Sequence, residues 1–300
     1  MKALVTGAAG FVGRYLVAHL EAMGDKVDSL DHHGPDPVDV TDSDAVRDRV
    51  AESAPDAVYH LAGVSHVGSS WSAPLEVFRI NTEGAINVLR ACVDSGVARV
   101  LVTGSADAYG ATAAEIDVLR EDLPLRPLSP YGVSKAAAEL CALQAYLADG
   151  LAVTCVRAFN HTGPGQLDRF LVPSLARRIV EAERTGAKDV KVGNLDAIRD
   201  FSDVRDVVRA YRLLVEHGVP GEVYNVCSGS GVRVADIAGR MLAAAETELS
   251  LSVDPALVRP IEVPRLIGSN ERLRAATGWE PAHTLEATLA DVLSYWRDQP

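Results

Sequence analysis

Short apolar runs alternate with segments of helical periodicity through the first half of this chain. The runs predict strands at residues 3–6, 26–30, 56–61, 99–103 and 152–157. The segments between them predict helices at residues 11–23, 45–53, 80–93 and 129–147. Thr41 or Ser43 is expected to cap the helix at 45–53. Continuous apolar strands that alternate with helices are typical of a parallel sheet covered on both faces, so we expect a doubly wound α/β fold.

The alternation weakens after residue 160. Helices are predicted at residues 171–185, 204–217, 234–246 and 285–296, and short strands at 190–192 and 223–227. The chain has 300 residues, which allows one large domain or two smaller ones. We expect residues 1–160, with parts of 190–230, to form a first domain. Residues 161–300 should mainly form a smaller C-terminal α/β lobe that binds substrate.

A glycine-rich turn, TGAAGFVG, lies between the first predicted strand and the first predicted helix. Its glycines are Gly7, Gly10 and Gly13. Glycine lets the backbone approach a pyrophosphate, and the helix N-terminus offers amide donors to it. Because the turn lies in the required strand–turn–helix context, it predicts dinucleotide binding by a Rossmann-type domain.

Asp31 ends the second predicted strand, 18 residues beyond Gly13. A carboxylate at this place accepts hydrogen bonds from the adenosine ribose and repels a 2′-phosphate. No Arg follows within the next ten residues. The sequence therefore favours NAD(H) over NADP(H), which stays the alternative. Asp39 and Val40 are expected beside the adenine.

Tyr131 and Lys135 are four residues apart in SPYGVSKAAAEL, so a helix would place both on one face. A nearby ammonium favours the phenolate and lowers the pKa of a tyrosine. Such a tyrosine can exchange a proton with a carbinol oxygen while a hydride moves to or from a nicotinamide. Ser105, just beyond the fourth predicted strand, could hydrogen-bond the same oxygen.

These motifs resemble the extended short-chain dehydrogenase/reductases that modify nucleotide sugars. The resemblance runs from Thr6 to Gly229, about three quarters of the chain. The segments that carry it are TGAAGFVG, DAVYHLAGVSHVG, NTEGAINVLRAC, VTGSADAYG, SPYGVSKAAAE, RAFNHTGPGQ, VPSLARRI, NLDAIRDFSDVRDVV and GEVYNVCSG. Within the family they are most similar to the GDP-mannose 4,6-dehydratases and, more closely, to the GDP-4-keto-6-deoxy-mannose reductases.

The resemblance implies a role for each matching residue. Tyr131 would be the acid/base, Lys135 would lower its pKa and hold the nicotinamide ribose, and Ser105 would polarise the sugar oxygen. Asp107 could act as a further base. Asn81 matches an asparagine behind the active site. The implied cofactor-binding residues are Gly7, Gly10, Phe11, Val12, Gly13, Leu61, Ala62 and Gly63. The implied substrate-binding residues are Ser65, His66, Asn160, Val172, Pro173, Ser174, Val192, Arg199 and Arg259.

The resemblance leaves several reactions open. The leading hypothesis is reduction of a GDP-4-keto-6-deoxy-hexose at C4, with the proton from Tyr131. A 4,6-dehydratase needs a further base, for which Asp107 is the candidate, and a nucleotide-sugar 4-epimerase would keep its cofactor tightly bound. A sensor that binds NAD without catalysis is the non-enzymatic alternative.

Charge and composition limit the partners. The formal net charge is −12, which disfavours nucleic acid because phosphate backbones need concentrated Lys and Arg. The four cysteines are scattered and no zinc ligands cluster, so we expect reduced thiols and no metal. No stretch resembles a membrane span or a secretory leader, which predicts a cytoplasmic protein. Residues 81–93 and 129–147 are rich in Ala and Leu, and in the family such helices form a homodimer contact.

Overall fold

Six parallel strands form the sheet of the first lobe, in the order β2-β1-β3-β4-β5-β9. The structure is a computed structural model and describes residues 1–34, 36–257 and 263–300. The strands are β1 (Lys2–Thr6), β2 (Lys26–Leu30), β3 (Ala57–His60), β4 (Arg99–Ser105), β5 (Val153–Ala158) and β9 (Val223–Val226). Strand order reverses between β1 and β3, so the carboxyl ends of these strands open a crevice at the edge where Rossmann folds bind ligands.

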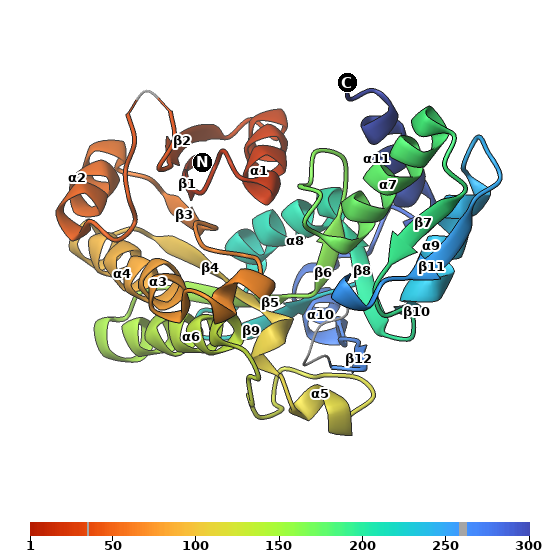
Figure 1. Cartoon of the computed structure of the whole chain (residues 1–300). Helices are drawn as coiled ribbons and strands as arrows, with labels where there is room; N and C mark the ends of the chain where they lie inside the picture. The colour runs from red at the N-terminus through yellow and green to blue at the C-terminus, as the bar shows by residue number, and fades with distance from the viewer. Residues whose placement is uncertain (35, 258–262) are drawn as a thin grey trace.

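Helices cover both faces of this sheet (Figure 1). On one face, α1 (Phe11–Ala22) and α8 (Val204–His217) bury Leu16, Leu20 and Tyr211 against the strands. On the other face lie α2 (Ser43–Ser53), α4 (Gly84–Asp94) and α6 (Pro130–Asp149). The doubly wound α/β fold expected from the sequence is confirmed, because the two apolar faces of the sheet are each closed by their own helices.

The first core also takes side chains from far along the chain. Leu273 of α10 (Glu271–Thr277) and Trp279 are fully buried in the same cluster as β1 and α8. The Trp279 indole N–H donates to the backbone oxygen of Asp206 at 3.0 Å. The core of the first lobe therefore contains residues from the N-terminal part of the chain and residues 273–279, which follow most of the second lobe in the sequence.

The second lobe packs helices against short strands. Its core lies between α7 (Leu171–Thr185), α9 (Val234–Ala243) and α11 (Leu285–Arg297). The strands of this part are β6 (Asn160–Thr162), β7 (Asp189–Val192), β8 (Ile198–Asp203), β10 (Gly231–Arg233), β11 (Ser250–Val253) and β12 (Arg265–Leu266). Strand β8 pairs with β6, β10 and β12, and β11 pairs with β7. The smaller C-terminal α/β lobe is confirmed. The division at residue 160 stays a prediction.

Shorter helical elements fill the connections. They are α3 (Pro74–Phe78), α5 (Thr112–Glu115), a π-helical turn (Arg79–Glu83) and 3-10 turns at Gly68–Trp71, Ala106–Ala108 and Pro255–Leu257. No helix within the described ranges is long and apolar enough to cross a membrane.

The cap of α2 differs from the prediction. Asp42, rather than Thr41 or Ser43, accepts hydrogen bonds from the amides of Asp44 and Ala45. The Thr41 hydroxyl instead donates to Asp39 at 2.9 Å, and Ser43 is already the first helical residue. Asp42 occupies the N-cap position, from which a side-chain oxygen reaches the open amides of the first turn, and Thr41 lies one residue before it.

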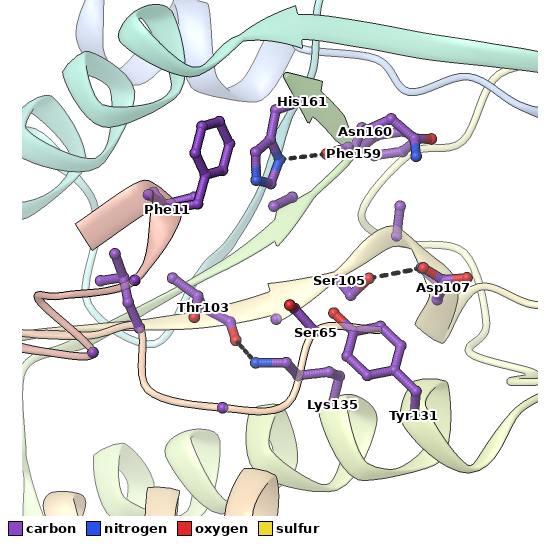
Figure 2. Close-up of a pocket in the computed structure, with 18 of the residues that line it drawn as sticks. Phe11, Ser65, Thr103, Ser105, Asp107, Tyr131, Lys135, Phe159, Asn160 and His161 are labelled. Carbon is purple, nitrogen blue, oxygen red and sulfur yellow. Dashed lines mark hydrogen bonds between the residues drawn. The ribbon is translucent and has the colours of Figure 1, made fainter. Parts of the chain in front are cut away.

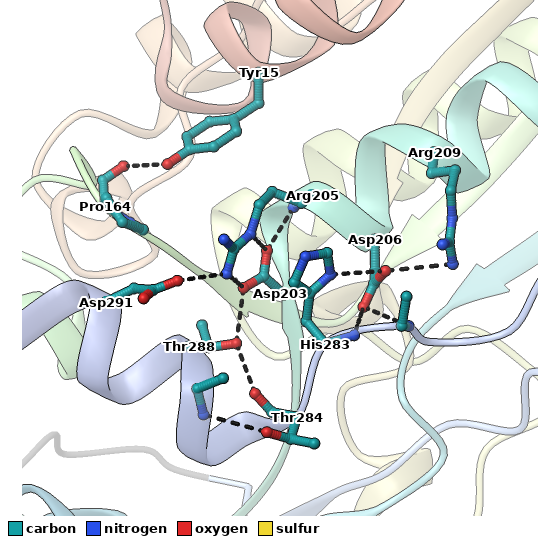
Figure 3. A network of polar contacts seen from close by, with 12 residues as sticks. Tyr15, Pro164, Asp203, Arg205, Asp206, Arg209, His283, Thr284, Thr288 and Asp291 are labelled. Atoms are coloured by element: carbon teal, nitrogen blue, oxygen red, sulfur yellow. Dashed lines mark hydrogen bonds and ion pairs between the residues drawn. The ribbon is translucent and has the colours of Figure 1, made fainter.

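A buried polar network joins α8 of the first lobe to α11 of the second (Figure 3). Asp203 caps α8 through the amide of Arg205, and it accepts a hydrogen bond from Thr288 of α11 at 2.7 Å. The Arg205 guanidinium bridges Asp203 and Asp291 at 2.6 and 2.8 Å. Because Asp203 is 3% exposed and charged, these partners compensate its loss of water and hold the lobes together.

Candidate active site

A cavity of about 240 Å³ opens at the carboxyl ends of β1, β4 and β5. Figure 2 shows Tyr131 and Lys135 on one side of it, with Phe11 and His161 on the opposite side. The expected residues that line it are Gly7, Gly10, Phe11, Val12, Gly13, Leu61, Gly63, Ser65, Ser105, Asp107, Tyr131, Lys135 and Asn160. Most of the candidate cofactor and catalytic residues therefore meet in one place.

The glycine-rich turn has no room for side chains. Gly7 has φ +71°, and a Cβ there would lie 2.8 Å from the amide nitrogen of Ala62. A Cβ on Gly13 would lie 2.1 Å from the backbone oxygen of Gly7. The helix α1 that follows has no side-chain cap at Gly10, so its first-turn amides are left to a ligand. This bare backbone at a helix N-terminus fits the diphosphate of a dinucleotide.

A second cavity, of about 350 Å³, adjoins the turn and is lined by Asp31, Asp39 and Val40, which are expected at the adenosine, and by Ala62 of the cofactor-lining strand end. Asp31 accepts hydrogen bonds from the amides of Ala9, at 2.8 Å, and His33, at 3.1 Å. The carboxylate is thus fixed beside the turn, where it can meet a ribose. Hydrogen bonds from the amide and hydroxyl of Thr41 lower the pKa of Asp39, which keeps it charged.

The first turns of α6 present Tyr131 and Lys135 to the cavity. Ser129 caps the helix by accepting from the amide of Gly132 at 3.0 Å. The Lys135 ammonium donates to the backbone oxygen of Thr103 at 2.9 Å. Burial lowers the pKa of Lys135 to about 8, so the ammonium is still mostly charged at neutral pH.

Tyr131 is protonated in this setting. Burial raises the pKa of its phenol, the charge of Asp107 raises it further, and a hydrogen bond with Ser105 opposes both. The Lys135 ammonium donates to the backbone oxygen of Thr103 in this arrangement, and the expectation that it lowers the pKa of Tyr131 stays a prediction. A protonated phenol is the state from which a proton donor must start.

Ser105 and Asp107 form a small polar pair beside the phenol. The Ser105 hydroxyl donates to the Asp107 carboxylate at 3.2 Å and accepts from the Asp107 amide at 3.2 Å. Asp107 also lines a neighbouring cavity of about 170 Å³ that contains His66, Asn160 and Arg199. A carboxylate is therefore placed between the reacting hydroxyls and the substrate side of the site.

Asn81 supports the site from behind, as the resemblance implies. Its side chain accepts from the amide of Val64 at 2.8 Å and donates to Ser134 of α6 at 2.9 Å. A Cβ on Gly63 would lie 2.8 Å from the Asn81 amide oxygen. Asn81 thereby fixes the strand end that lines the cofactor cavity against the helix that carries Tyr131.

A third cavity, of about 500 Å³, lies between the first lobe and α7. Of the expected substrate residues, those that line it are His66, Asn160, Val172, Ser174, Val192 and Arg199. Pro173 is buried and does not line it, since successive side chains of a helix point about 100° apart and only its neighbours face the cavity. Arg259 lies outside the described residues.

Arg199 does not depend on the acidic residues next to it in sequence. Its guanidinium donates to the backbone oxygens of Ile198, at 2.9 Å, and Pro264, at 3.5 Å. Asp200 accepts hydrogen bonds from Ser228, and Asp203 is paired with Arg205. Arg199 lines the third cavity, and its role in binding the substrate stays a prediction.

Several lining residues were not foreseen. They are His161, Gln166, Arg169, Phe170, Arg178 and Phe201. Three of them, His161, Gln166 and Arg169, belong to the segment HTGPGQLDR, which its composition predicts only as a loop. The glycines and proline of that segment signalled a turn, but not which of its side chains turn inward. Among the described residues, no group of His, Cys, Asp or Glu could hold a metal ion.

Comparison with known proteins identifies the family. The profile of the NAD dependent epimerase/dehydratase family matches residues 3–227. The chain belongs to this family. Family membership makes it an enzyme of the nucleotide-sugar oxidoreductase, epimerase and dehydratase group that binds NAD or NADP.

Individual members of the family match over nearly the whole chain. GDP-6-deoxy-D-mannose reductase of Pseudomonas aeruginosa is 38% identical over 300 residues, 99% of this chain and 98% of that protein. GDP-6-deoxy-D-talose 4-dehydrogenase of Aggregatibacter actinomycetemcomitans is 30% identical, over 93% of this chain and 92% of that protein. The structure of RMD from P. aeruginosa complexed with NADPH, also 38% identical, has a TM-score of 0.90 and covers 99% of both chains.

Proposed function

We propose that this enzyme reduces the 4-keto group of a GDP-linked 4-keto-6-deoxy-hexose. The observation that carries the proposal is the buried Tyr131, which lines the cofactor cavity together with Ser105 and Lys135. The similarity to a GDP-6-deoxy-D-mannose reductase supports the choice of sugar and base.

The chemistry divides between cofactor and protein. The reduced nicotinamide supplies the hydride that C4 receives. Tyr131 gives its phenolic proton to the C4 oxygen, and Ser105 holds that oxygen by a hydrogen bond. Lys135 places a positive charge beside the phenolate that forms. Arg199 binds the diphosphate, since a guanidinium can give two hydrogen bonds to it at once.

The choice of cofactor follows from Asp31. Its fixed carboxylate would repel a 2′-phosphate, which favours NADH. The structure of the P. aeruginosa relative is a complex with NADPH, so NADPH is the alternative. Running every assay with each cofactor decides between them.

The test is the loss of absorbance of the reduced cofactor when enzyme and GDP-4-keto-6-deoxy-mannose are mixed. Tyr131→Phe should lower turnover by about 10²–10⁴-fold while cofactor binding is kept. Tyr146→Phe, on the exposed part of the same helix, is the matched control and should be fully active. No consumption of either NADH or NADPH by the wild type would refute the proposal.

A dehydratase is the second candidate, because Asp107 puts a carboxylate beside Ser105. A dehydratase or a 4-epimerase would convert GDP-mannose, or another nucleotide sugar, without added NADH. Incubating the purified enzyme with GDP-mannose alone and analysing the products separates these activities from the reductase.

A further inference from the structure

Residues 163–170 connect β6 to α7 and form part of the wall of the third cavity, and we call them the wall loop. Phe170, at its end, lines the cofactor cavity, the third cavity and the neighbouring cavity of about 170 Å³. Arg169 lines the third cavity, and its guanidinium lies 5.5 Å from the centre of the Phe170 ring. The loop consists of turns and irregular backbone, so the place of these two side chains depends on the contacts that hold it.

Gln166 holds the wall loop to the strand before it. Its side-chain oxygen accepts a hydrogen bond from the Thr162 hydroxyl at 2.8 Å, and its side-chain nitrogen donates to the backbone oxygen of His161 at 3.1 Å. The Gln166 side chain is buried. Both ends of this amide are thus engaged by β6, which fixes the first half of the loop on the side of the second lobe.

Two consecutive side chains of α1 hold the loop from the side of the first lobe. The Tyr15 hydroxyl donates to the backbone oxygen of Pro164 at 2.8 Å (Figure 3), and the Arg14 guanidinium donates to that of Gly165 at 3.3 Å. Burial, and after it the charge of Asp203, raise the pKa of Tyr15, so the phenol is protonated and donates. Because proline has no N–H, its carbonyl is the only backbone group by which Pro164 can be held.

Tyr15 reaches the ligands only through this loop, since it is absent from the linings of the cavities described above. Its ring packs edge-on against that of Phe11, with centroids 5.6 Å apart, and Phe11 does line the cofactor cavity. The helix that begins at the glycine-rich turn therefore also fixes the backbone that leads to Arg169 and Phe170.

We propose that Tyr15 is a positioning residue for the sugar nucleotide, because its hydroxyl holds the wall loop with Arg169 and Phe170 at the third cavity. Without the hydroxyl, a smaller fraction of the molecules has the loop in the binding conformation, and the apparent affinity falls by that fraction. Tyr131 and Ser105 belong to α6 and β4 and not to the loop, so the chemical step should be unaffected. The inference rests on the proposed function for its choice of substrate.

The test is Tyr15→Phe, which removes the hydroxyl and keeps the ring against Phe11. With GDP-4-keto-6-deoxy-mannose, KM should rise about fivefold, the effect of one neutral hydrogen bond. The value of kcat, and the Kd of the reduced cofactor measured by calorimetry, should stay within about twofold of the wild type.

The matched control is Tyr224→Phe. The Tyr224 hydroxyl is also in a single hydrogen bond of the backbone, which it accepts from the Val219 amide at 3.0 Å, and Tyr224 is buried away from the cavities described above. Both variants should lower Tm by about 2 °C. Only Tyr15→Phe should raise KM, whereas a purely structural role of Tyr15 would leave KM alike in the two variants.

Arg14→Met removes the second hydrogen bond to the loop and should also raise KM, and it is judged by the same results if Tyr15→Phe does not fold. A KM within about twofold of the wild type overturns the proposal. So does a fall in kcat at unchanged KM, or an equal loss of affinity for the cofactor, which would assign the effect to α1 itself.

A binding measurement separates this inference from the proposed function. If the enzyme does not reduce the proposed sugar, the Kd of GDP-mannose is measured by calorimetry in place of KM. An increase of about fivefold in Tyr15→Phe then supports the role of Tyr15 although the proposed reaction has failed. An unchanged Kd, or no binding of GDP-mannose by the wild type, overturns it.

Discussion

The buried ion pair between Glu139 and Arg157 ties the catalytic helix to the sheet, and its loss can be predicted quantitatively. Glu139 lies on α6, four residues after Lys135, and Arg157 lies on β5. Two hydrogen bonds of 2.7 and 2.9 Å join them, and the side chains are 9% and 5% exposed. Arg157 also donates to Tyr109 and to the backbone oxygen of Glu121, at 2.8 and 3.0 Å.

Glu139→Gln removes the negative charge and leaves the guanidinium buried. Removing one partner of such a pair lowers the free energy of unfolding by about 3–5 kcal/mol. Because the glutamine keeps an amide oxygen that can still accept a hydrogen bond from Arg157, we expect a loss of about 3 kcal/mol for this variant. With an unfolding entropy of about 0.6 kcal/mol per kelvin for a chain of this length, Tm should fall by about 5 °C.

Urea denaturation and calorimetry measure this loss. The double variant Glu139→Gln/Arg157→Met should recover most of it, since no unpaired charge is then buried. Glu83→Gln is the matched control, because it breaks an exposed pair with Arg79 and should cost less than about 0.5 kcal/mol. A Tm of Glu139→Gln within about 1 °C of the wild type would refute the reasoning.

Two further predictions concern the site and the surface. Because burial lowers the pKa of Lys135 to about 8, its charge is present below that pH and lost above it. We expect kcat/KM to fall as the pH rises through about 8, and a profile that is level to about pH 10 would contradict this role. We also propose a homodimer, because the adjoining helices α3 and α6 carry exposed leucines. The exposed fractions are 80% for Leu75 of α3, and 61% and 72% for Leu140 and Leu147 of α6. Leu140→Lys/Leu147→Lys should reduce the sedimentation mass from two chains to one, whereas a wild-type mass near 31.9 kDa would exclude the dimer.

Long elements with a clear apolar period could be predicted from the sequence. The helices α7 and α8 have the predicted limits, because each buries one continuous apolar face. Strand β8, IRDFSD, was missed because its buried acids resemble a solvated loop. Asp200 and Asp203 are stabilised there by hydrogen bonds from Ser228 and Thr288, which come from distant parts of the chain, and from the neighbouring Arg205.

Some features of the candidate site could likewise be predicted from the sequence, and others could not. Tyr131, Lys135 and the glycines were predictable because their spacing within one element determines their geometry. The inward direction of Phe170, and the buried position of Pro173, depend on how α7 packs against the first lobe. The pKa of Tyr131 depends on burial, and spacing alone does not report burial.

The packing of Trp279 and β9 into the first lobe sets an order of events during synthesis. After β5 leaves the ribosome, its outer edge has no partner until β9 is made, and the face against α1 remains open until Leu273 and Trp279 follow. At about 5–20 residues per second, this interval is on the order of ten seconds. An unpaired strand edge and an uncovered apolar face are the features that invite aggregation. The nascent cofactor lobe is therefore open to aggregation until these later segments have been made.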